Sequence, residues 1–287
     1  MSPDQETEFP AQTQRRPGHE AEMSPEPHDE MRGYAGSGKL AGQAALITGG
    51  DSGIGRAVAV AFAKEGADVA FAYLSEDDDA EHTVKLVEAE GRRAVAIRGD
   101  LTEEERCTAA VEETVAKLGR LDVLVNHIAY QAPDVPFEEI TSAQWDLTFK
   151  TNVYSFFWTT RAALAHLPDG GAIINTGSIN GLRGNETLID YAATKGAVQS
   201  LTYSLAQALT ERRIRVNCVA PGPVWTPLIT STFDAETVAA FGAQTPMGRA
   251  AQPDEIAPSY VFFASEQLSS YYTGEVLAPI GGETLPG

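Results

Sequence analysis

The sequence predicts an α/β protein built on one doubly wound parallel sheet of seven strands, with helices on both faces of the sheet. Two observations support this fold class. Short apolar runs alternate with longer stretches in which apolar residues recur at i, i+3 and i+4, which are the patterns of buried strands and amphipathic helices. The first apolar run also leads through a glycine-rich turn into a helical stretch. Alternation of this kind is typical of parallel sheets that are covered on both faces.

The expected elements follow one another in a regular order. The apolar runs predicted as strands are 44–48, 68–73, 93–98, 122–126, 172–176, 215–220 and 275–280. The stretches predicted as helices are 54–65, 78–90, 103–118, 143–167, 191–211 and 254–264. Right-handed crossovers between them give the Rossmann-type arrangement, in which ligands bind beyond the carboxyl ends of the strands.

Two segments depart from this alternation. Residues 1–39 are rich in Pro, Gln, Glu and Gly and poor in aliphatic residues, so they cannot bury enough apolar surface to fold alone. They form a polar N-terminal arm that is either disordered or laid across the domain 40–287 or a neighbouring subunit, with Tyr34 and the Gly-Ser-Gly at 36–38 as docking point and hinge. Residues 220–250 hold several Pro and Gly residues and two short helical pieces, which predicts a substrate loop or lid.

The composition limits the class of protein. A length of 287 residues with 43% hydrophobic content suits one large domain. The net charge of -19 disfavours nucleic-acid binding, because phosphate backbones require clustered Lys and Arg. Cys107 and Cys218 lie far apart, with no CxxC or His spacing, so neither a disulfide framework nor a metal site is expected. No apolar run reaches the ~18 residues of a membrane helix and no secretory signal is recognisable, so we expect a cytoplasmic protein without a membrane partner.

A glycine-rich turn, TGGDSGIG at 48–55, connects the first predicted strand to a helix. Gly49 allows a tight turn, Gly53 lets the backbone approach a diphosphate, and Gly55 lets the helix pack closely on the strand. The helix N-terminus offers N–H groups and the positive end of its dipole to an anion. Strand, glycine turn and helix together predict a dinucleotide-binding site.

Tyr191 and Lys195 are four residues apart in a predicted helix, so their side chains share one helical face. A free Tyr has a pKa of about 10. A neighbouring Lys cation and an oxidised nicotinamide would both stabilise the phenolate and lower that pKa. A Tyr with a lowered pKa is a workable general acid or base near neutral pH.

These motifs resemble those of the short-chain dehydrogenase/reductase family. TGGDSGIG is similar to the family fingerprint TGxxxGxG, and the later motifs follow in the expected order over roughly residues 40–285. The arm followed by GSGKL and GGDSGIGRAV resembles a subgroup of general-stress oxidoreductases and glucose dehydrogenases. The resemblance implies an NAD(P)-dependent oxidoreductase that transfers a hydride between nicotinamide and a small alcohol or carbonyl compound such as an aldehyde, ketone or sugar.

The resemblance implies four catalytic residues. Tyr191 would give a proton to the substrate oxygen, and Ser178 would hydrogen-bond that oxygen. Lys195 would bind the nicotinamide ribose, and Asn152 would hold a water that links Lys195 to solvent. Two of these residues also have alternative, purely structural roles. Ser178 is then a helix cap, and Asn152 is a kink or packing residue. His127 departs from the family's Asn-Asn-Ala-Gly motif and is either a polar residue in a strand-end turn or an added proton-relay group.

The resemblance also implies a set of cofactor-binding residues. An NAD site would place Asp or Glu at the end of the second strand, where this sequence has Tyr73. The missing carboxylate removes a repulsion of the 2′-phosphate and favours NADP over NAD, although no Arg replaces it and acidic residues follow at 76–79. Asp100 is assigned to the adenine, with a helix-capping turn as its alternative. The whole set is Gly49, Asp51, Ser52, Gly53, Ile54, Gly55, Tyr73, Leu74, Ser75, Asp100, Leu101, Asn126, Ala129, Tyr191, Lys195, Pro221, Gly222, Val224 and Thr226.

Assembly and substrate are less closely determined. The resemblance implies a homotetramer that assembles through the helices carrying Asn152 and Tyr191 and through the C-terminal strand. Large apolar residues of the predicted lid indicate a largely apolar pocket wall, which suits aldehydes, ketones or quinones, whereas the subgroup resemblance indicates sugars such as glucose. These lid residues are Trp225, Leu228, Ile229, Phe233, Phe241 and Met247. The main alternative function is a nucleotide sensor without turnover, which the intact catalytic set disfavours.

Overall fold

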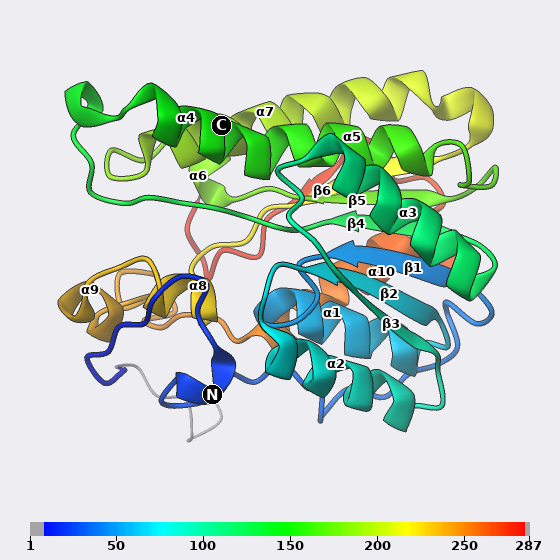
Figure 1. Cartoon of the computed structure of the whole chain (residues 1–287), viewed down its shortest axis with the longest axis horizontal. Helices are drawn as coiled ribbons and strands as arrows, with labels where there is room; N and C mark the ends of the chain where they lie inside the picture. The colour runs from blue at the N-terminus through cyan, green and yellow to red at the C-terminus, as the bar shows by residue number, and fades with distance from the viewer. Residues whose placement is uncertain (1–8, 285–287) are drawn as a thin grey trace.

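A computed structural model describes residues 9–284, so the first eight residues of the predicted arm and the last three of the predicted domain lie outside the described range. The core is one sheet of seven strands in the order β3-β2-β1-β4-β5-β6-β7, with every neighbouring pair parallel (Figure 1). The strands are β1 (Ala44–Thr48), β2 (Asp68–Tyr73), β3 (Ala94–Arg98), β4 (Val123–Asn126), β5 (Ala172–Thr176), β6 (Arg215–Val219) and β7 (Val276–Leu277). The predicted fold class is confirmed.

Helices cover both faces of the sheet and enclose two separate hydrophobic cores. One face carries α1 (Gly53–Lys64), α2 (Asp77–Ala89) and α10 (Pro253–Ala264). The other carries α3 (Glu104–Leu118), α5 (Ser155–Ala163) and α7 (Ile189–Ala208), as Figure 1 shows. Strand order reverses between β1 and β4, so their carboxyl ends open the crevice in which doubly wound folds bind ligands.

The predicted helix 143–167 is broken. It consists of α4 (Ser142–Phe149), a π-helical turn at Lys150–Tyr154, and α5. The break lies at Asn152, whose side chain hydrogen-bonds to the backbone of Tyr130, on a segment distant in sequence. Single π-turns inside helices are frequent at functional sites.

The last predicted strand, 275–280, is shortened to two residues. β7 pairs only with β6, through Cys218 and Val219, and Pro279 and the two glycines after Ile280 then lead the chain away. Gly281 and Gly282 both adopt positive φ values, of 61° and 90°, which ends the extended conformation.

Short elements complete the fold. They are α6 (Ile179–Arg183), α8 (Pro227–Thr230), α9 (Ala235–Ala239), α11 (Glu266–Ser269) and 3₁₀ turns at Glu20–Glu22, Phe137–Glu139 and Thr210–Arg212. Within residues 9–284, no helix has both the length and the apolar character required to cross a membrane. The same residues contain no group of three or more His, Cys, Asp or Glu side chains that could hold a metal ion.

The described part of the arm, residues 9–39, lies against α8 and α9 (Figure 1). Phe9 stacks on Trp225 with the ring centroids 3.7 Å apart and the planes 3° from parallel. The indole Nε1 of Trp225 donates to the carbonyl of Pro25 at 2.9 Å. Together with Met23, Ile229 and neighbouring residues, these side chains form a third hydrophobic cluster between the arm and the predicted lid.

The arm is also fixed to the first helix by buried charges. Arg56 of α1 is only 3% exposed and pairs with Glu20 and with Asp29, which lies 3.2 Å away. Glu20 also accepts the backbone N–H of Gly53, at the first residue of α1, over 2.6 Å. This contact satisfies an N–H that a helix N-terminus otherwise leaves without a partner.

Tyr34 and the Gly-Ser-Gly at 36–38, predicted as the docking point and hinge of the arm, pack on the C-terminal end of α1. The hydroxyl of Tyr34 hydrogen-bonds to Glu65, which also accepts the N–H groups of Ser37 and Lys39 at 2.9 Å. A Cβ on Gly36 would lie 1.9 Å from the carbonyl oxygen of Lys64, so only glycine fits this close approach.

Candidate active site

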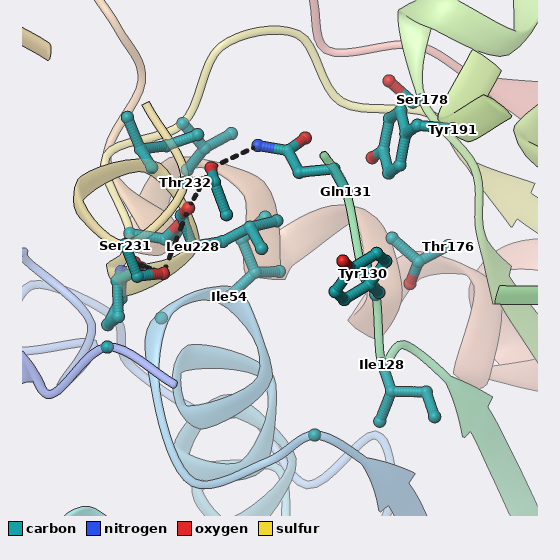
Figure 2. A pocket seen from close by; sticks show the side chains of 18 of the residues that line it. Ile54, Ile128, Tyr130, Gln131, Thr176, Ser178, Tyr191, Leu228, Ser231 and Thr232 are labelled. Atoms are coloured by element: carbon teal, nitrogen blue, oxygen red, sulfur yellow. Dashed lines mark hydrogen bonds between the residues drawn. The ribbon is translucent and has the colours of Figure 1, made fainter. Parts of the chain in front are cut away.

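A pocket of about 1060 Å³ opens at the carboxyl ends of the strands (Figure 2). Its volume is at the upper end of the range for ligand sites, roughly 300–1,000 Å³. Its wall contains most of the predicted site residues, namely Gly49, Asp51, Ser52, Gly53, Ile54, Tyr73, Leu74, Asp100, Leu101, Ala129, Ser178, Tyr191, Lys195, Pro221, Gly222, Val224 and Thr226. Four predicted residues lie outside the wall, namely Gly55, Ser75, Asn126 and Asn152.

The glycine turn is shaped for close backbone contact. Gly49 and Gly53 have φ values of 75° and 52°, a region that favours glycine. A Cβ on Gly55 would lie 1.8 Å from the carbonyl oxygen of Gly49, so Gly55 acts by packing the helix against the turn. Ile54, in the first turn of α1, faces the pocket (Figure 2). The N-terminus of α1 therefore borders the pocket, where Glu20 of the arm accepts the N–H of its first residue, Gly53.

Gly55→Ala is expected to lower the free energy of unfolding by about 1–3 kcal/mol and to weaken dinucleotide binding at the same time, because the added methyl group must displace the turn. Urea denaturation and a dinucleotide titration measure the two effects. Gly33→Ala is the matched control, since a Cβ there meets no atom within 4 Å. Equal behaviour of the two variants would contradict this account of the turn.

One end of the pocket is lined by Asp51, Tyr73 and Glu76. Burial, and then the nearby Glu76 carboxylate, raise the pKa of Asp51 to about 7. The hydroxyl of Tyr73 donates to Asp77 at 2.9 Å, and Asp77 also pairs with Arg98 at 3.0 Å. Sequence reasoning missed Arg98, because only the β2–β3 register places it opposite Tyr73.

Ser75, predicted to bind the cofactor, lies outside the pocket wall. Its backbone N–H donates to the Glu76 carboxylate at 2.6 Å, whereas Leu74 lines the pocket and is 49% exposed. Asn126, at the end of β4, donates to Thr160 and Asn175 at 3.0 and 2.9 Å. The Asn126 amide nitrogen thus connects β4 to the neighbouring helix and strand.

At the other end of the pocket, the side chains of Ser178 and Tyr191 lie next to each other (Figure 2). Ser178 follows β5 and caps α6, where its hydroxyl oxygen accepts the N–H of Asn180 at 3.1 Å. Its hydrogen bond with Tyr191 favours the phenolate form of that side chain. Ser178 therefore combines the capping role and the site position that the sequence left as alternatives.

The pKa of Tyr191 differs from the expected one. Burial raises it to about 12, opposed only by the hydrogen bond with Ser178. Lys195 Nζ lies 5.5 Å from the centroid of the Tyr191 ring and donates to the carbonyl of Thr176 at 2.8 Å. Burial also lowers the pKa of Lys195 to about 8. In this structure, desolvation is therefore the larger influence on the pKa of Tyr191, and the lowering expected from Lys195 and oxidised nicotinamide together stays a prediction.

Asn152 is fully buried in the π-helical turn and connects two segments of the site. Its amide donates to the carbonyl of Tyr130 at 2.8 Å and to the Thr194 hydroxyl at 3.0 Å, and it accepts the N–H of Tyr130 at 2.7 Å. These contacts fit the packing role that the sequence left open for Asn152. They hold the segment after β4 against α7 at Thr194, the residue directly before Lys195.

His127 lines the pocket and hydrogen-bonds through Nδ1 to the Thr176 hydroxyl at 3.0 Å. Thr176 also bonds to the Tyr260 hydroxyl at 2.8 Å. Burial, with Lys195 as a second cause, lowers the pKa of His127 to about 3. The imidazole therefore stays neutral at physiological pH, as a polar member of a buried network.

The lid only partly matches the expected apolar wall. Leu228, Ile229, Phe233 and Phe241 line the pocket. Trp225 instead faces the arm, where Phe9 covers it, and Met247 is 49% exposed outside the wall.

Polar side chains that the sequence did not indicate also contribute to the wall. Gln131 points toward Thr232 of the predicted lid and donates to its hydroxyl at 2.8 Å (Figure 2). Arg16, Arg183 and Asn185 line the pocket as well. No local pattern marks these residues, because segments distant in sequence bring them to the site.

Known proteins are similar to this chain over nearly its whole length. A family described as enoyl-(acyl carrier protein) reductase matches residues 49–284. General stress protein 39 of Bacillus subtilis (strain 168) is 57% identical over 276 residues, which are 96% of each chain. NADPH-dependent aldehyde reductase 1, chloroplastic, of Arabidopsis thaliana is 48% identical over 94% of this chain and 96% of its own.

A solved structure has the same architecture. The short-chain dehydrogenase from Burkholderia cenocepacia J2315, in complex with NADP, aligns with a TM-score of 0.79 at 33% identity. The alignment covers 98% of that chain but 85% of this one, so this chain carries segments that the Burkholderia protein lacks.

Proposed function

The chain belongs to the short-chain dehydrogenase/reductase family, and from that premise we propose that it reduces small aldehydes with NADPH through Tyr191. It is an NAD(P)-dependent oxidoreductase that acts on alcohol and carbonyl groups. The observation that carries the proposal is the adjacent Ser178 and Tyr191 side chains at the wall of the pocket, with Lys195 buried beside them.

Bound nicotinamide supplies the hydride, and the side chains donate the proton and stabilise the charge that develops. With a pKa of about 12, Tyr191 holds its proton at neutral pH and can donate it to a carbonyl oxygen that gains charge. The neighbouring Ser178 hydroxyl stabilises the same oxygen by a hydrogen bond. Lys195, held by the carbonyl of Thr176, places a positive charge next to the phenol, which favours the phenolate left after proton transfer.

The walls of the pocket support an aldehyde substrate with an apolar body. Leu228, Ile229, Phe233 and Phe241 give the pocket wall an apolar part, and the Arabidopsis relative is named as an aldehyde reductase. A second candidate is a sugar, because Gln131, Arg183 and Asn185 offer hydrogen bonds to hydroxyl groups.

A substrate panel distinguishes these candidates. Purified protein with NADPH should reduce aliphatic and aromatic aldehydes with a higher kcat/KM than it shows for glucose oxidation with NADP. A higher kcat/KM for glucose would favour the sugar, and tight dinucleotide binding without turnover on any compound would favour the nucleotide sensor.

We propose NADP(H) as the cofactor, because the Burkholderia structure contains NADP and the Arabidopsis relative is named for NADPH. Two acidic side chains, Asp51 and Glu76, line the end of the pocket near Tyr73 and oppose a 2′-phosphate when both are charged. A pKa of about 7 leaves Asp51 largely neutral below that pH, which reduces the repulsion.

NADPH affinity is therefore expected to fall severalfold between pH 6 and pH 8, since Asp51 loses its proton through this range and then repels the phosphate. Titrations at a series of pH values measure the effect. NADH, which lacks the 2′-phosphate, should show a smaller change, and Asp51→Asn should flatten the NADPH profile. An unchanged profile in Asp51→Asn would show that another group causes the pH dependence.

We also propose that residues 1–39 act as an arm on the domain 40–287, that 220–250 form the substrate lid, and that the protein is a cytoplasmic homotetramer. Four exposed large side chains on α4, α5, α7 and the π-helical turn support assembly through these helices, namely Leu147, Tyr154, Phe157 and Tyr203. Sedimentation equilibrium tests the assembly, and a monomer at micromolar concentration would contradict it.

A further inference from the structure

The N-terminal arm reaches the wall of the pocket. Arg16, Pro17 and Gly18 line it, although they precede the first strand by more than twenty residues. A Cβ on Gly18 would lie 2.7 Å from the carbonyl oxygen of Pro227, so the arm backbone packs directly on α8. The backbone of Gln14 donates to the carbonyl of Thr230, also in α8, at 2.7 Å.

Anchors on both sides fix the position of this segment. Before it, Phe9 stacks on Trp225 of the lid. After it, Glu20 binds the N–H of Gly53 and the side chain of Arg56. Residues 16–18 are therefore held between the proposed lid and the glycine turn, at the wall of the pocket.

Arg16 presents its charge next to a fixed aromatic ring. Its guanidinium carbon lies 4.8 Å from the centroid of the Tyr130 ring, a cation–π distance. Asn152 holds the backbone of Tyr130 through both its N–H and its carbonyl. Tyr130 lines the same pocket as Ile54 of the glycine turn and Thr176, so the Arg16 guanidinium lies against a wall that the glycine turn and the proposed catalytic side chains share (Figure 2).

The other cations of the pocket wall are already bound by the protein. Arg183 pairs with Glu283 at 2.8 Å, and Lys195 donates to the carbonyl of Thr176. Arg16, by contrast, forms no ion pair with any side chain in the described range 9–284, and it is exposed at the pocket. In a protein of net charge -19, an unneutralised guanidinium at a pocket is a specific attraction for an anion.

We propose that Arg16 binds an anionic group within the pocket, either the diphosphate of the dinucleotide or an acid group on the substrate. This inference rests on the proposed function, because that function brings the anion. The arm then completes the active site and contributes a binding residue that lies outside the residues matched by the family. A guanidinium suits either anion, since its planar N–H groups match phosphate and carboxylate oxygens.

The test compares Arg16→Gln with Arg15→Gln, which removes the same charge from the neighbouring exposed residue that does not line the pocket. Dissociation constants are measured for NADPH and NADH, and KM is measured for succinic semialdehyde, which is anionic, and butanal, which is neutral. Loss of one exposed ionic contact is expected to weaken binding about fivefold. Arg16→Lys should recover part of the loss, and the unfolding transition of each variant shows whether the fold is intact.

The pattern of change identifies the anion. Weaker binding of NADPH and NADH alike in Arg16→Gln, with Arg15→Gln unchanged, supports the diphosphate. A raised KM for succinic semialdehyde alone, with butanal and both dinucleotides unchanged, supports an acid group on the substrate.

Equal behaviour of Arg16→Gln and Arg15→Gln in every measurement overturns the proposal while leaving the proposed function intact. A wild-type protein that neither binds dinucleotide nor reduces any aldehyde would overturn both, so the two failures are distinguishable.

Discussion

Tyr191→Phe is expected to lower kcat for carbonyl reduction by about 10²–10⁴-fold, the range typical of a lost general acid. Phenylalanine fills the same buried space, so the change removes only the hydroxyl that donates the proton and its hydrogen bond with Ser178. Dinucleotide binding should therefore change little. Steady-state kinetics with NADPH and an aldehyde, together with a dinucleotide titration, separate the two effects.

Tyr260→Phe provides the matched control. Tyr260 is buried, as Tyr191 is, and its hydroxyl bonds to Thr176 rather than facing the pocket. Its loss should cost about 1 kcal/mol of stability and leave kcat within a small factor. Comparable activity in Tyr191→Phe and the wild type would remove Tyr191 from the chemistry and transfer the proton-donor role to another group.

Glu20→Ala is expected to lower the free energy of unfolding by about 3 kcal/mol, because breaking a buried ion pair leaves an uncompensated charge. Arg56 would keep Asp29 at 3.2 Å and Asp79 at 3.5 Å, which limits the loss. The change also removes the acceptor for the N–H of Gly53 at the start of α1. Urea denaturation followed by circular dichroism measures the difference.

Glu22→Ala changes the same residue type in the same 3₁₀ turn, but Glu22 is exposed, so stability should stay within about 0.5 kcal/mol of the wild type. If Glu20→Ala were as stable as Glu22→Ala, the arm would not be held by this ion pair.

The sheet could be read from the sequence because buried parallel strands are continuous apolar runs bounded by turns. The predicted strands 44–48, 68–73 and 172–176 coincide with β1, β2 and β5. The run 275–280 was too long, because an apolar pattern does not show that only β6 is available for pairing. The helix 143–167 was predicted as continuous, because the π-helical turn depends on the contact of Asn152 with Tyr130.

The candidate site also contains features that the sequence predicted and features that it did not. The glycine turn and the Tyr191–Lys195 pair depend on spacings within one turn or one helix, so the sequence placed them on the same pocket wall. The position of Arg98 opposite Tyr73 depends on the register of β2 and β3. The contact of Gln131 with Thr232 depends on the fold of residues 220–250. No local sequence pattern predicts either contact.

By itself, the sequence determined the order of strands and helices along the chain, the glycine turn and the chemical types of the side chains proposed to react, because periodicity and short spacings act over a few residues. Only the tertiary structure decided that the polar arm packs on the lid, that Trp225 faces Phe9 instead of the pocket, and that Tyr191 has a raised pKa. Those features depend on burial and on contacts between distant segments. Desolvation free energies follow from which groups lose water, and that is fixed only when the whole chain is packed.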